Sequence, residues 1–442
     1  MKPIFLRNLL LLFTIIFPVV IQAQDITIIH AGTIMETPGE GVTFNKTIII
    51  KNGIILKVRD GFLDATELGI TYTSSNLIDL SNKFVLPGFI DAHVHLATDY
   101  DMNNPHEWLS QYDEDLAFES IPYLKKTIEA GFTTVRDMGG KYKLIIAIQN
   151  AIQNDLIIGP RIIAATSPIS TIGGPLDING YRPEVLNAFE TKAIICSGAD
   201  DCRKAVRTSV KHGAEFIKVF ATGSVLGQTE TDVGRILTDD ELYSIVETSK
   251  MLGKKVAAHA HQTDGINAAL RAGVNSIEHG TFLNDESIEL FTKTGAYLVP
   301  TLLIGVVLKE ELESKNTTPP NIAEKIRMVV PQHEIAFKKA LKGNVRIAFG
   351  TDATQGICNH GTNAREFELM VLYGMQNEDA IVAATINAAD LLGMSNKIGT
   401  IEAGKYADII AVEGNPLEDI SVLKNVQFVM KEGAIIKNII KK

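Results

Sequence analysis

The stretch Phe89-Ile-Asp-Ala-His-Val-His95 places two histidines at the end of a short apolar segment that is typical of a β-strand. Side chains two positions apart on a strand lie on the same face, so His93 and His95 can point together toward one ion. Four more residues end similar apolar segments: Lys218, His259, His279 and Asp352. Imidazole, carboxylate and an anionic lysine derivative are ligands that suit zinc. The pattern therefore predicts a metal-dependent hydrolase.

Lys218 is the hardest of these residues to explain without a functional site. Its neighbours Phe216, Ile217, Val219 and Phe220 are apolar, so the sequence predicts a buried amine, and an unpaired buried charge is strongly unfavourable. By contrast, a His-x-His pair alone is more often part of an ordinary strand, and a Gly-Thr-Asp sequence is usually a turn or a helix cap. The occurrence of all six residues at strand ends favours one common site.

Longer motifs around these residues resemble the amidohydrolase superfamily, in the branch of imidazolonepropionase-like enzymes and Xaa-Pro dipeptidases. The matching segments are Val85-Leu-Pro-Gly-Phe-Ile-Asp-Ala-His-Val-His-Leu96, Ile217-Lys-Val-Phe-Ala-Thr-Gly223, His259-Ala-His261, Ile277-Glu-His-Gly280, Gly350-Thr-Asp-Ala353, His360-Gly-Thr-Asn-Ala-Arg-Glu-Phe367, Ala384-Thr-Ile-Asn-Ala-Ala389 and Gly404-Lys-Tyr-Ala-Asp-Ile-Ile410. The resemblance implies that His93 and His95 hold one metal and that His259 and His279 hold a second. It also implies that Lys218 bridges the two metals as a carbamate.

The implied cofactors are two divalent ions, expected to be zinc, bridged by carboxylated Lys218. Burial depresses the pKa of a lysine and leaves its neutral amine free to combine with carbon dioxide. Two metals that share a water lower the pKa of that water toward neutrality. Asp352 resembles the metal-contacting base of the family and would pass a proton to the leaving amine. The implied reaction is hydrolysis of an amide or peptide bond.

Four further residues are candidates for roles around the reacting group. His261 shares a strand face with His259, and we assign it to the substrate carbonyl or to the outer shell of the metal site, with plain packing as the alternative. Arg235 is predicted to bind a substrate carboxylate, because arginine suits bidentate pairing with such a group; a surface ion pair is the alternative. His360 and Asn363 are predicted to meet the substrate or to belong to a hydrogen-bond network within their loop.

The substrate is less constrained than the reaction. In the dipeptidase branch that the chain resembles, a tyrosine and an arginine after the barrel lysine hold the substrate carboxylate, whereas the segment 221–238 contains Arg235 and no tyrosine. The Gly-Gly-His of that branch is here Gly173-Gly174-Pro175. We expect an Xaa-Pro dipeptidase or carboxypeptidase-like enzyme that cleaves a dipeptide or N-acyl amino acid. The alternatives are imidazolonepropionase or another cyclic-amide hydrolase, and a catalytically inactive barrel that serves as a binding module.

Alternating strand and helix patterns predict an α/β fold, a (β/α)8 TIM barrel over residues 85–397 with its site at the carboxyl ends of the strands. After the strand that carries His93, strands are expected at 133–136, 161–165, 216–220, 256–261, 276–279, 296–301 and 345–350. Helices are expected at 117–130, 142–153, 202–212, 239–252, 265–272, 285–294, 323–341 and 379–392. Short alternating strands in 24–84 and 398–442 predict a small β-sandwich built from both chain ends, and 301–331 is a candidate lid.

Residues 1–23 have the features of a signal peptide, with Lys2 and Arg7 before an apolar run from Leu9 to Val20. We therefore expect export, to a bacterial periplasm, with no membrane anchor after cleavage; an uncleaved anchor helix is the alternative. Cys196 and Cys202 would form a disulfide there or remain two thiols, and Cys358 is expected to fill space.

The composition bears on the partners of the protein. The net charge is −10 and the pI is about 5.6, which argues against nucleic acid and anionic membrane surfaces as partners. The expected partner is a small-molecule or dipeptide substrate. A homo-oligomer is compatible with the sequence, which does not determine the oligomeric state.

Overall fold

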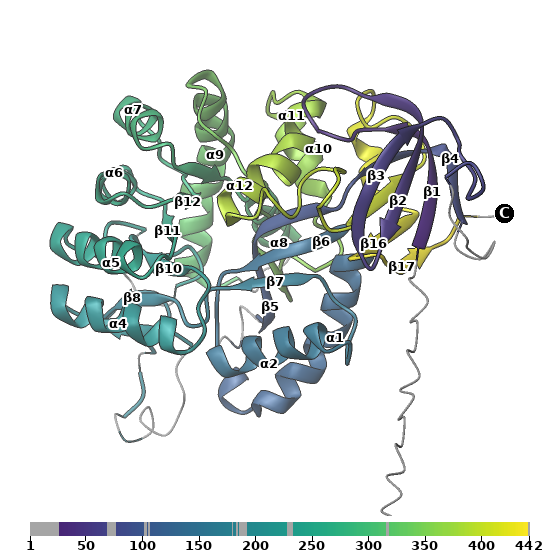
Figure 1. Ribbon diagram of the computed structural model, residues 1–442. Coiled ribbons are helices and arrows are strands. Elements are labelled where there is room, and N and C mark those ends of the chain that lie inside the picture. Colours follow the sequence, from purple (N-terminus) through teal and green to yellow (C-terminus); the bar gives the residue numbers. More distant parts are fainter. Residues whose placement is uncertain are drawn as a thin grey trace, which may run out of the picture.

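The computed structural model describes residues 26–68, 77–100, 104, 107–178, 180–182, 184, 192–227, 233–314 and 318–440. A barrel ringed by helices fills most of the molecule, and a smaller unit made of strands lies at its side (Figure 1). The expected signal segment 1–23 lies outside the described residues. Among the helices of the described residues, none combines the length and the apolar character that crossing a bilayer requires.

The barrel consists of seven parallel strands and one extended segment at residues 345–350. The strands are β5 (Phe89–Asp99), β6 (Phe132–Asp137), β7 (Arg161–Ala164), β10 (Ile217–Phe220), β11 (Val256–Ala260), β12 (Ser276–His279) and β13 (Tyr297–Val299). The segment 345–350 joins the two sides of the barrel, because Ala348 N donates to Leu298 O at 3.0 Å and Ala92 N donates to Phe349 O at 2.9 Å. These bonds support the predicted (β/α)8 barrel.

Three short strands were not expected from the sequence: β8 (Ile169–Thr171), β9 (Ile194–Cys196) and β14 (Ala353–Gln355). β8 pairs with β10 through Ile169 and Val219, and it also pairs in parallel with β9. β14 continues the eighth barrel segment and pairs with the end of β5. All three are too short to give a clear alternating pattern.

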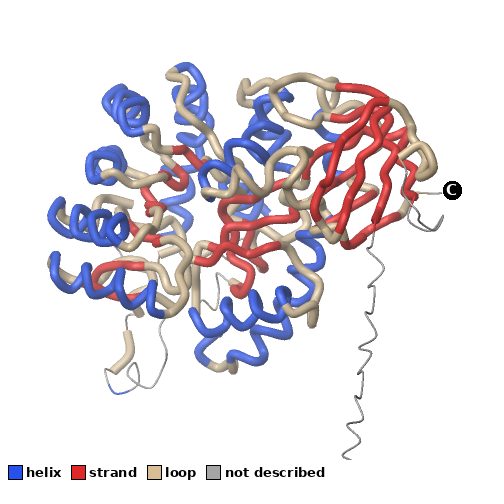
Figure 2. Tube along the Cα trace, viewed as in Figure 1, coloured by secondary structure: helices blue, strands red, loops and turns tan. Residues whose placement is uncertain are grey.

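The expected helices surround the barrel, as Figure 2 shows in blue. They are α1 (Asp113–Glu129), α2 (Tyr142–Gln153), α4 (Ala199–Lys211), α5 (Asp239–Met251), α6 (Thr263–Ala272), α7 (Asp285–Thr294) and α9 (Pro320–Lys342). The helix expected at 379–392 is divided into α11 (Asn377–Val382), a π-helical turn (Ala383–Asn387) and α12 (Ala388–Leu392). Single 3-10 turns lie at Glu107–Leu109 and Ile420–Lys424. Helix α5 begins with a capping box, in which Thr238 N donates to Glu241 at 2.9 Å.

The candidate lid at 301–331 contains α8 (Leu302–Ser314) and the first half of α9. Apolar residues of the two helices pack together, among them Ile304 on α8 and Val329 on α9. Helix α10 (Arg365–Leu372), like α8, was not expected from the sequence. It fixes the start of α8, because Glu366 accepts hydrogen bonds from Leu302 N at 2.9 Å and from Leu303 N at 2.6 Å. The candidate lid therefore belongs to a packed pair of helices, α8 and α9.

Both chain ends contribute to the smaller unit, a seven-stranded mixed sheet in the order β17-β16-β15-β4-β1-β2-β3. Its strands are β1 (Ile26–Ile34), β2 (Thr43–Lys51), β3 (Ile54–Asp60), β4 (Leu77–Pro87), β15 (Ile409–Val412), β16 (Phe428–Lys431) and β17 (Ala434–Asn438). An antiparallel bridge between Ile54 and Tyr406 brings β3 back toward the C-terminal strands, and an apolar core lies inside. This arrangement fits the predicted sandwich. Strand β4 runs across the predicted boundary at residue 84, so the division into domains remains a prediction.

Cys196 and Cys202 form a disulfide at the start of α4, with their Cα atoms 5.0 Å apart. Cys358 is a buried free thiol. The structure thus favours the first of the two states that the sequence left open for Cys196 and Cys202. The position of Cys358 in the core beside Val225 agrees with its expected space-filling role.

Candidate active site

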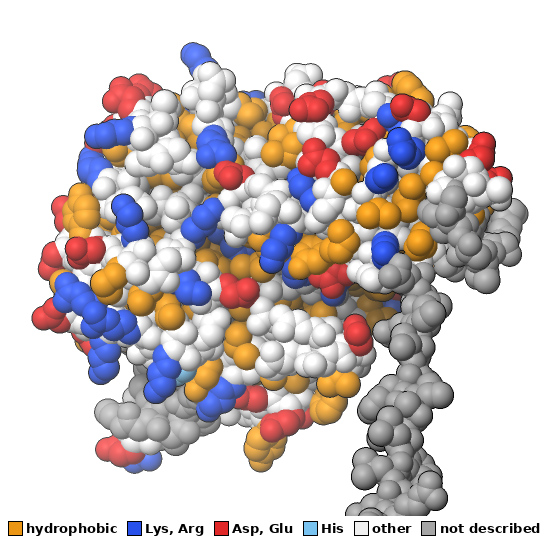
Figure 3. Space-filling view, viewed as in Figure 1, with side chains coloured by type: hydrophobic (Ala, Val, Ile, Leu, Met, Phe, Trp, Pro, Cys, Tyr) orange, Lys and Arg blue, Asp and Glu red, His pale blue; other side chains and the backbone are white. Residues whose placement is uncertain are grey.

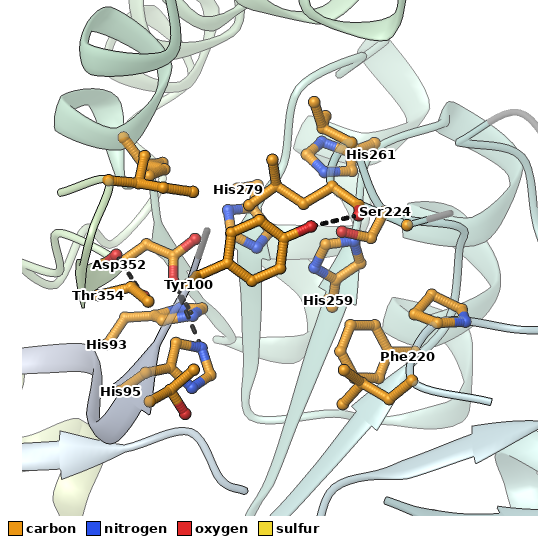
Figure 4. A pocket seen from close by; sticks show the side chains of 18 of the residues that line it. His93, His95, Tyr100, Phe220, Ser224, His259, His261, His279, Asp352 and Thr354 are labelled. Carbon is orange, nitrogen blue, oxygen red and sulfur yellow. Dashed lines mark hydrogen bonds and ion pairs between the residues drawn. The ribbon is translucent and has the colours of Figure 1, made fainter. Parts of the chain in front are cut away.

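The first half of the site lies at the end of β5. His93 and His95 point to one carboxylate oxygen of Asp352, and the Nε2 atom of each histidine is 3.4 Å from Oδ1. Figure 4 shows the two imidazoles and the carboxylate facing each other across the end of the barrel. The alternation of a strand places both histidines on this face, as the sequence predicted. Asp352 follows the eighth barrel segment and completes the group.

The second half contains three histidines: His259 of β11, His261 directly after β11, and His279 of β12. Ligand atoms of His259, His261 and His279 lie within 4.8 Å of one another, and the ring centroids of His259 and His279 are 4.5 Å apart. His279 also groups with His93 and Asp352 at the same distance limit. His279 therefore connects the two halves, which lie side by side in Figure 4.

Hydrogen bonds from behind fix the orientation of most of these imidazoles. The Nδ1 atoms are paired as follows: His93 with Glu278 at 2.8 Å, His95 with Gly139 O at 3.0 Å, His261 with Thr281 at 2.8 Å and His279 with Thr301 at 2.7 Å. Each pairing leaves Nε2 as the ligand atom, which is the usual arrangement around a bound metal. His259 differs, because its Nε2 donates to Gly223 O at 3.1 Å.

Lys218 lies on β10 and is 2% exposed. Burial lowers the pKa of its amine to about 8, although the nearby carboxylates of Glu278 and Asp352 oppose the shift. A positive charge on Lys218 in turn lowers the pKa values of His93 and His279. Its amine is therefore within electrostatic reach of both halves of the site, and a larger fraction of it is neutral near neutral pH than for an exposed lysine.

The protonation states of the ligands suit divalent metals. Burial lowers the pKa of His93 to about 4 and holds the pKa values of His259 and His279 well below their usual range. Burial raises the pKa of Asp352, but the charges of His93 and His95 outweigh it and the net shift is downward. Burial lowers the pKa of His95, but its hydrogen bond to Asp352 and the charges of Asp352 and Asp137 outweigh it, and the net shift is upward. Neutral imidazoles and an ionised carboxylate are the forms that bind metal, so a metal bound at His95 would displace its proton. The donor set therefore fits the metals that the fold implies.

The backbone is strained where the site residues leave their strands. His279, Thr301 and Asp352 have φ values of 71°, 48° and 59°, a left-handed conformation that residues other than glycine rarely adopt. Each such residue is destabilising by about 1–3 kcal/mol and persists where surrounding contacts determine the conformation. Here the strain occurs at the strand ends that turn His279 and Asp352 into the site. The sequence patterns contained no signal for it.

A cavity of about 240 Å³ lies in front of the histidines. Much of its wall is apolar, with contributions from Phe220 of β10, Ile304 and Leu308 of α8 and Val329 of α9. Tyr100 stands in front of the histidines in Figure 4, and its hydroxyl donates to Leu226 O at 3.1 Å. The cavity can therefore bury an apolar group of a substrate beside the polar ligands.

Three predicted substrate-binding residues do not lie among the described residues of the cavity wall. Arg235 donates to Leu237 O and to Asp239, each at 2.6 Å. His360 lies behind His95 and donates to its backbone oxygen at 3.1 Å. Asn363 is buried and donates to Asp91 at 2.8 Å. These contacts agree with the alternatives weighed from sequence, which were an ion pair for Arg235 and a loop network for the other two.

Two functional residues were missed by sequence reasoning. Glu278 joins His93 to Arg136, whose Nη2 atom is 2.8 Å from the other carboxylate oxygen. The pKa of Glu278 is lowered to about 2, because Arg136 and the hydrogen bond from His93 outweigh the opposing effect of burial. The sequence offered one signal for Glu278: it directly precedes His279 in the Ile277-Glu-His-Gly280 motif, on a strand whose side chains alternate between two faces.

A (β/α)8 barrel with this ligand set at the carboxyl ends of its strands defines a metal-dependent hydrolase. The family model described as the amidohydrolase family matches residues 84–436, and the chain belongs to that family. Its members include hydrolases of amide bonds, and this protein is a hydrolase that acts on carbon–nitrogen bonds.

Three similar proteins give the family context. The ochratoxinase of Aspergillus niger is 30% identical over 95% of this chain and 89% of its own length. A crystal structure of a Xaa-Pro dipeptidase with bound methionine in the active site has a TM-score of 0.85 and 37% identity, covering 93% of this chain and 99% of that one. The imidazolonepropionase of Clostridium tetani is 25% identical over 84% of each chain. These proteins are similar to most of the chain and bear different names, so the substrate requires separate argument.

Proposed function

We propose that the protein is an exported binuclear amidohydrolase that releases an amino acid from a dipeptide or an N-acyl amino acid. One metal would be held by His93 and His95, the other by His259 and His279, and carboxylated Lys218 would bridge them. Zinc suits these imidazole and carboxylate ligands. The proposal includes Asp352 as a further metal contact.

The observation that carries the proposal is the position of Lys218 between two groups of histidines. Its amine is buried, and its charge would act on His93 on one side and on His279 on the other. A cation in this place would oppose metal binding, because like charges repel strongly in a site of low dielectric. A carbamate on Lys218 would reverse the sign of that residue and would turn it into a ligand suited to divalent metal. The partly neutral amine supports this modification.

Different residues of the chain would have different roles in hydrolysis. Bound metals would polarise the scissile carbonyl and lower the pKa of a coordinated water. Asp352 would take a proton at its carboxylate and deliver it to the leaving amine, since it lies beside both ligands of β5. His261 would hold the substrate carbonyl or support the metal site from behind. The apolar wall of the cavity would exclude water and hold a substrate side chain.

Similarity to the Xaa-Pro dipeptidase with bound methionine supports an amino-acid product. Similarity to imidazolonepropionase supports the second candidate, a cyclic-amide hydrolase. Export, if the segment 1–23 is a cleaved signal, favours the dipeptidase. We retain Arg235 as the proposed partner of the substrate carboxylate and His360 and Asn363 as proposed substrate contacts. Their hydrogen bonds to Asp239, His95 and Asp91 are the competing explanation.

A substrate panel tests the proposal. Metal-loaded enzyme would be given dipeptides, N-acetyl amino acids and 4-imidazolone-5-propionate, and amine release and metal content would be measured together. Hydrolysis of linear amides with two metals per chain is expected. Turnover of the cyclic substrate alone would establish the second candidate, and the absence of metal and turnover would favour an inactive barrel. The N-terminal sequence of protein from a periplasmic extract tests export, with Gln24 expected first.

A further inference from the structure

His333 is a buried histidine of α9 that the proposed reaction does not use. Its side chain is 8% exposed and lines the cavity in front of the metal ligands. Neither ring nitrogen has a hydrogen-bond partner among the described residues. Buried polar atoms without partners are unfavourable and usually indicate a missing ligand or water. An imidazole whose two nitrogens lack partners therefore points to a polar group that enters the cavity.

The neighbour of His333 on α8 is adapted to this ring. A Cβ atom at Gly305 would lie 2.7 Å from Cε1 of His333 and closer still to Nδ1, so any larger residue at this position would force the imidazole to move. Glycine inside a helix is unfavourable relative to alanine. The presence of Gly305 in α8 is explained by the space that the imidazole occupies. The ring thus lies against the backbone of α8 on one side and faces the cavity on the other.

The residues around His333 determine which kind of chemical group it can bind. The same part of the wall is formed by Ile304, Leu308, Val329 and Val330. Burial lowers the pKa of His333 to about 4, which leaves a neutral ring with one donor and one acceptor at neutral pH. A charged group would lose its hydration among these apolar side chains, and none of the four carries a charge that would offset the loss. A hydroxyl group suits the ring better, because it can both donate and accept.

We propose that His333 is a specificity-determining residue, and that it hydrogen-bonds a hydroxyl group at the end of a large apolar substrate side chain. A tyrosine residue has this chemistry, because its ring suits the apolar wall and its phenol suits the imidazole. The inference rests on the proposed function, which supplies the dipeptide or N-acyl amino acid that carries this side chain. It goes further in naming the side chain that the enzyme prefers.

Two matched pairs of dipeptides test the proposal: Ala-Tyr with Ala-Phe, and Tyr-Ala with Phe-Ala. In one pair, kcat/KM for the tyrosine member should exceed that for the phenylalanine member by about tenfold, the effect expected of one added hydrogen bond. The ratio should fall to about 1 in His333→Leu and recover in part in His333→Gln, with metal content unchanged. Val330→Ala is the matched control: it enlarges the same wall and should change both members of a pair alike. Wild-type ratios near 1 in both pairs, or a ratio that survives His333→Leu, would overturn the proposal.

A binding measurement separates this proposal from the proposed function. The acids 3-(4-hydroxyphenyl)propionate and 3-phenylpropionate carry the two side chains and no amide bond. Calorimetry on metal-loaded protein should give a Kd about tenfold lower for the hydroxylated acid, and His333→Leu should abolish the difference. If no dipeptide is cleaved but this difference holds, the proposed function fails and the role of His333 stands. Equal binding of the acids, or binding of neither, would refute the role of His333.

Discussion

His93 donates a hydrogen bond from Nδ1 to Glu278 at 2.8 Å, although the two residues are 185 positions apart. Glu278 in turn pairs with the buried guanidinium of Arg136. The orientation of His93, a proposed metal ligand on β5, is therefore fixed by a carboxylate on β12 and a cation on β6. Such partners set the tautomer of a ligating imidazole.

Glu278→Gln should weaken both metal binding and the fold. The affinity for divalent metal should fall about 10- to 100-fold, because His93 loses its anionic partner. The free energy of unfolding of metal-free protein should fall by about 3–5 kcal/mol, because Arg136 becomes an uncompensated buried charge. Ser276→Ala is the control, since it removes a hydroxyl that donates to Glu278 at 2.5 Å and accepts from Arg136 at 3.2 Å but keeps both charges. Metal titration and urea unfolding of both variants check this, and equal metal affinities in the two would contradict it.

Replacing Thr301 and Thr281, which hydrogen-bond two histidines of the proposed second metal site, should show which of these histidines binds metal. Thr301 pairs with His279 at 2.7 Å, and Thr281 pairs with His261 at 2.8 Å. Thr301→Val should lower metal affinity by about tenfold or more, whereas Thr281→Val should leave metal content intact and change KM. A metal titration with substrate kinetics provides both readings. The reverse pattern would make His261 the ligand in place of His279 or His259.

Lys218→Ala should abolish metal retention and activity together, because the bridging anion is lost and two metal cations would face each other without it. Lys218→Arg should be no better, since guanidinium stays charged and cannot form a carbamate. Formate, acetate or bicarbonate should restore part of the activity of Lys218→Ala, whereas added metal alone should not. The metal-to-protein ratio is measured alongside turnover. Two metals and near-normal rates in Lys218→Ala would rule out the bridged arrangement.

Arg235→Ala tests the proposed carboxylate contact against the ion pair that the structure describes. If Arg235 binds substrate, KM should rise about tenfold or more for free dipeptides and change little for their C-terminal amides. If it only pairs with Asp239, both Arg235→Ala and Asp239→Asn should leave KM unchanged and lower stability by at most about 1 kcal/mol. Steady-state kinetics on acid and amide substrates, with urea unfolding of both variants, separate these outcomes.

Glu366 should make stability depend on pH. Burial raises the pKa of this carboxyl from 4.5 to about 8, against the opposing hydrogen bonds from Leu302 and Leu303. Between these values the unfolded chain has lost the proton and the folded chain keeps it, so stability is lost as the pH rises, by up to about 1.4 kcal/mol per unit. Relative to Glu366→Gln, the wild type should therefore lose stability from about pH 4.5 to 8. Urea unfolding across this range tests it, and parallel curves for the two proteins would contradict the assignment.

The sequence by itself determined the elements and the ligand types. Alternation on β5 placed His93 and His95 on one face, and apolar neighbours predicted the burial of Lys218. Both are local properties, since they depend on residues within a few positions. The strand at 345–350 was less regular than expected, because it pairs through one isolated bridge with Leu298 and one bond from Ala92, and not through a full ladder.

Tertiary structure decided what depends on contacts between distant segments. It paired Glu278 with His93 and placed His360 and Asn363 behind the site. Hydrogen bonds between residues far apart in the chain leave no periodic trace in the sequence, so no pattern could assign them. The contact between His333 and Gly305 is also set by tertiary structure, because it depends on how the faces of α8 and α9 pack against each other.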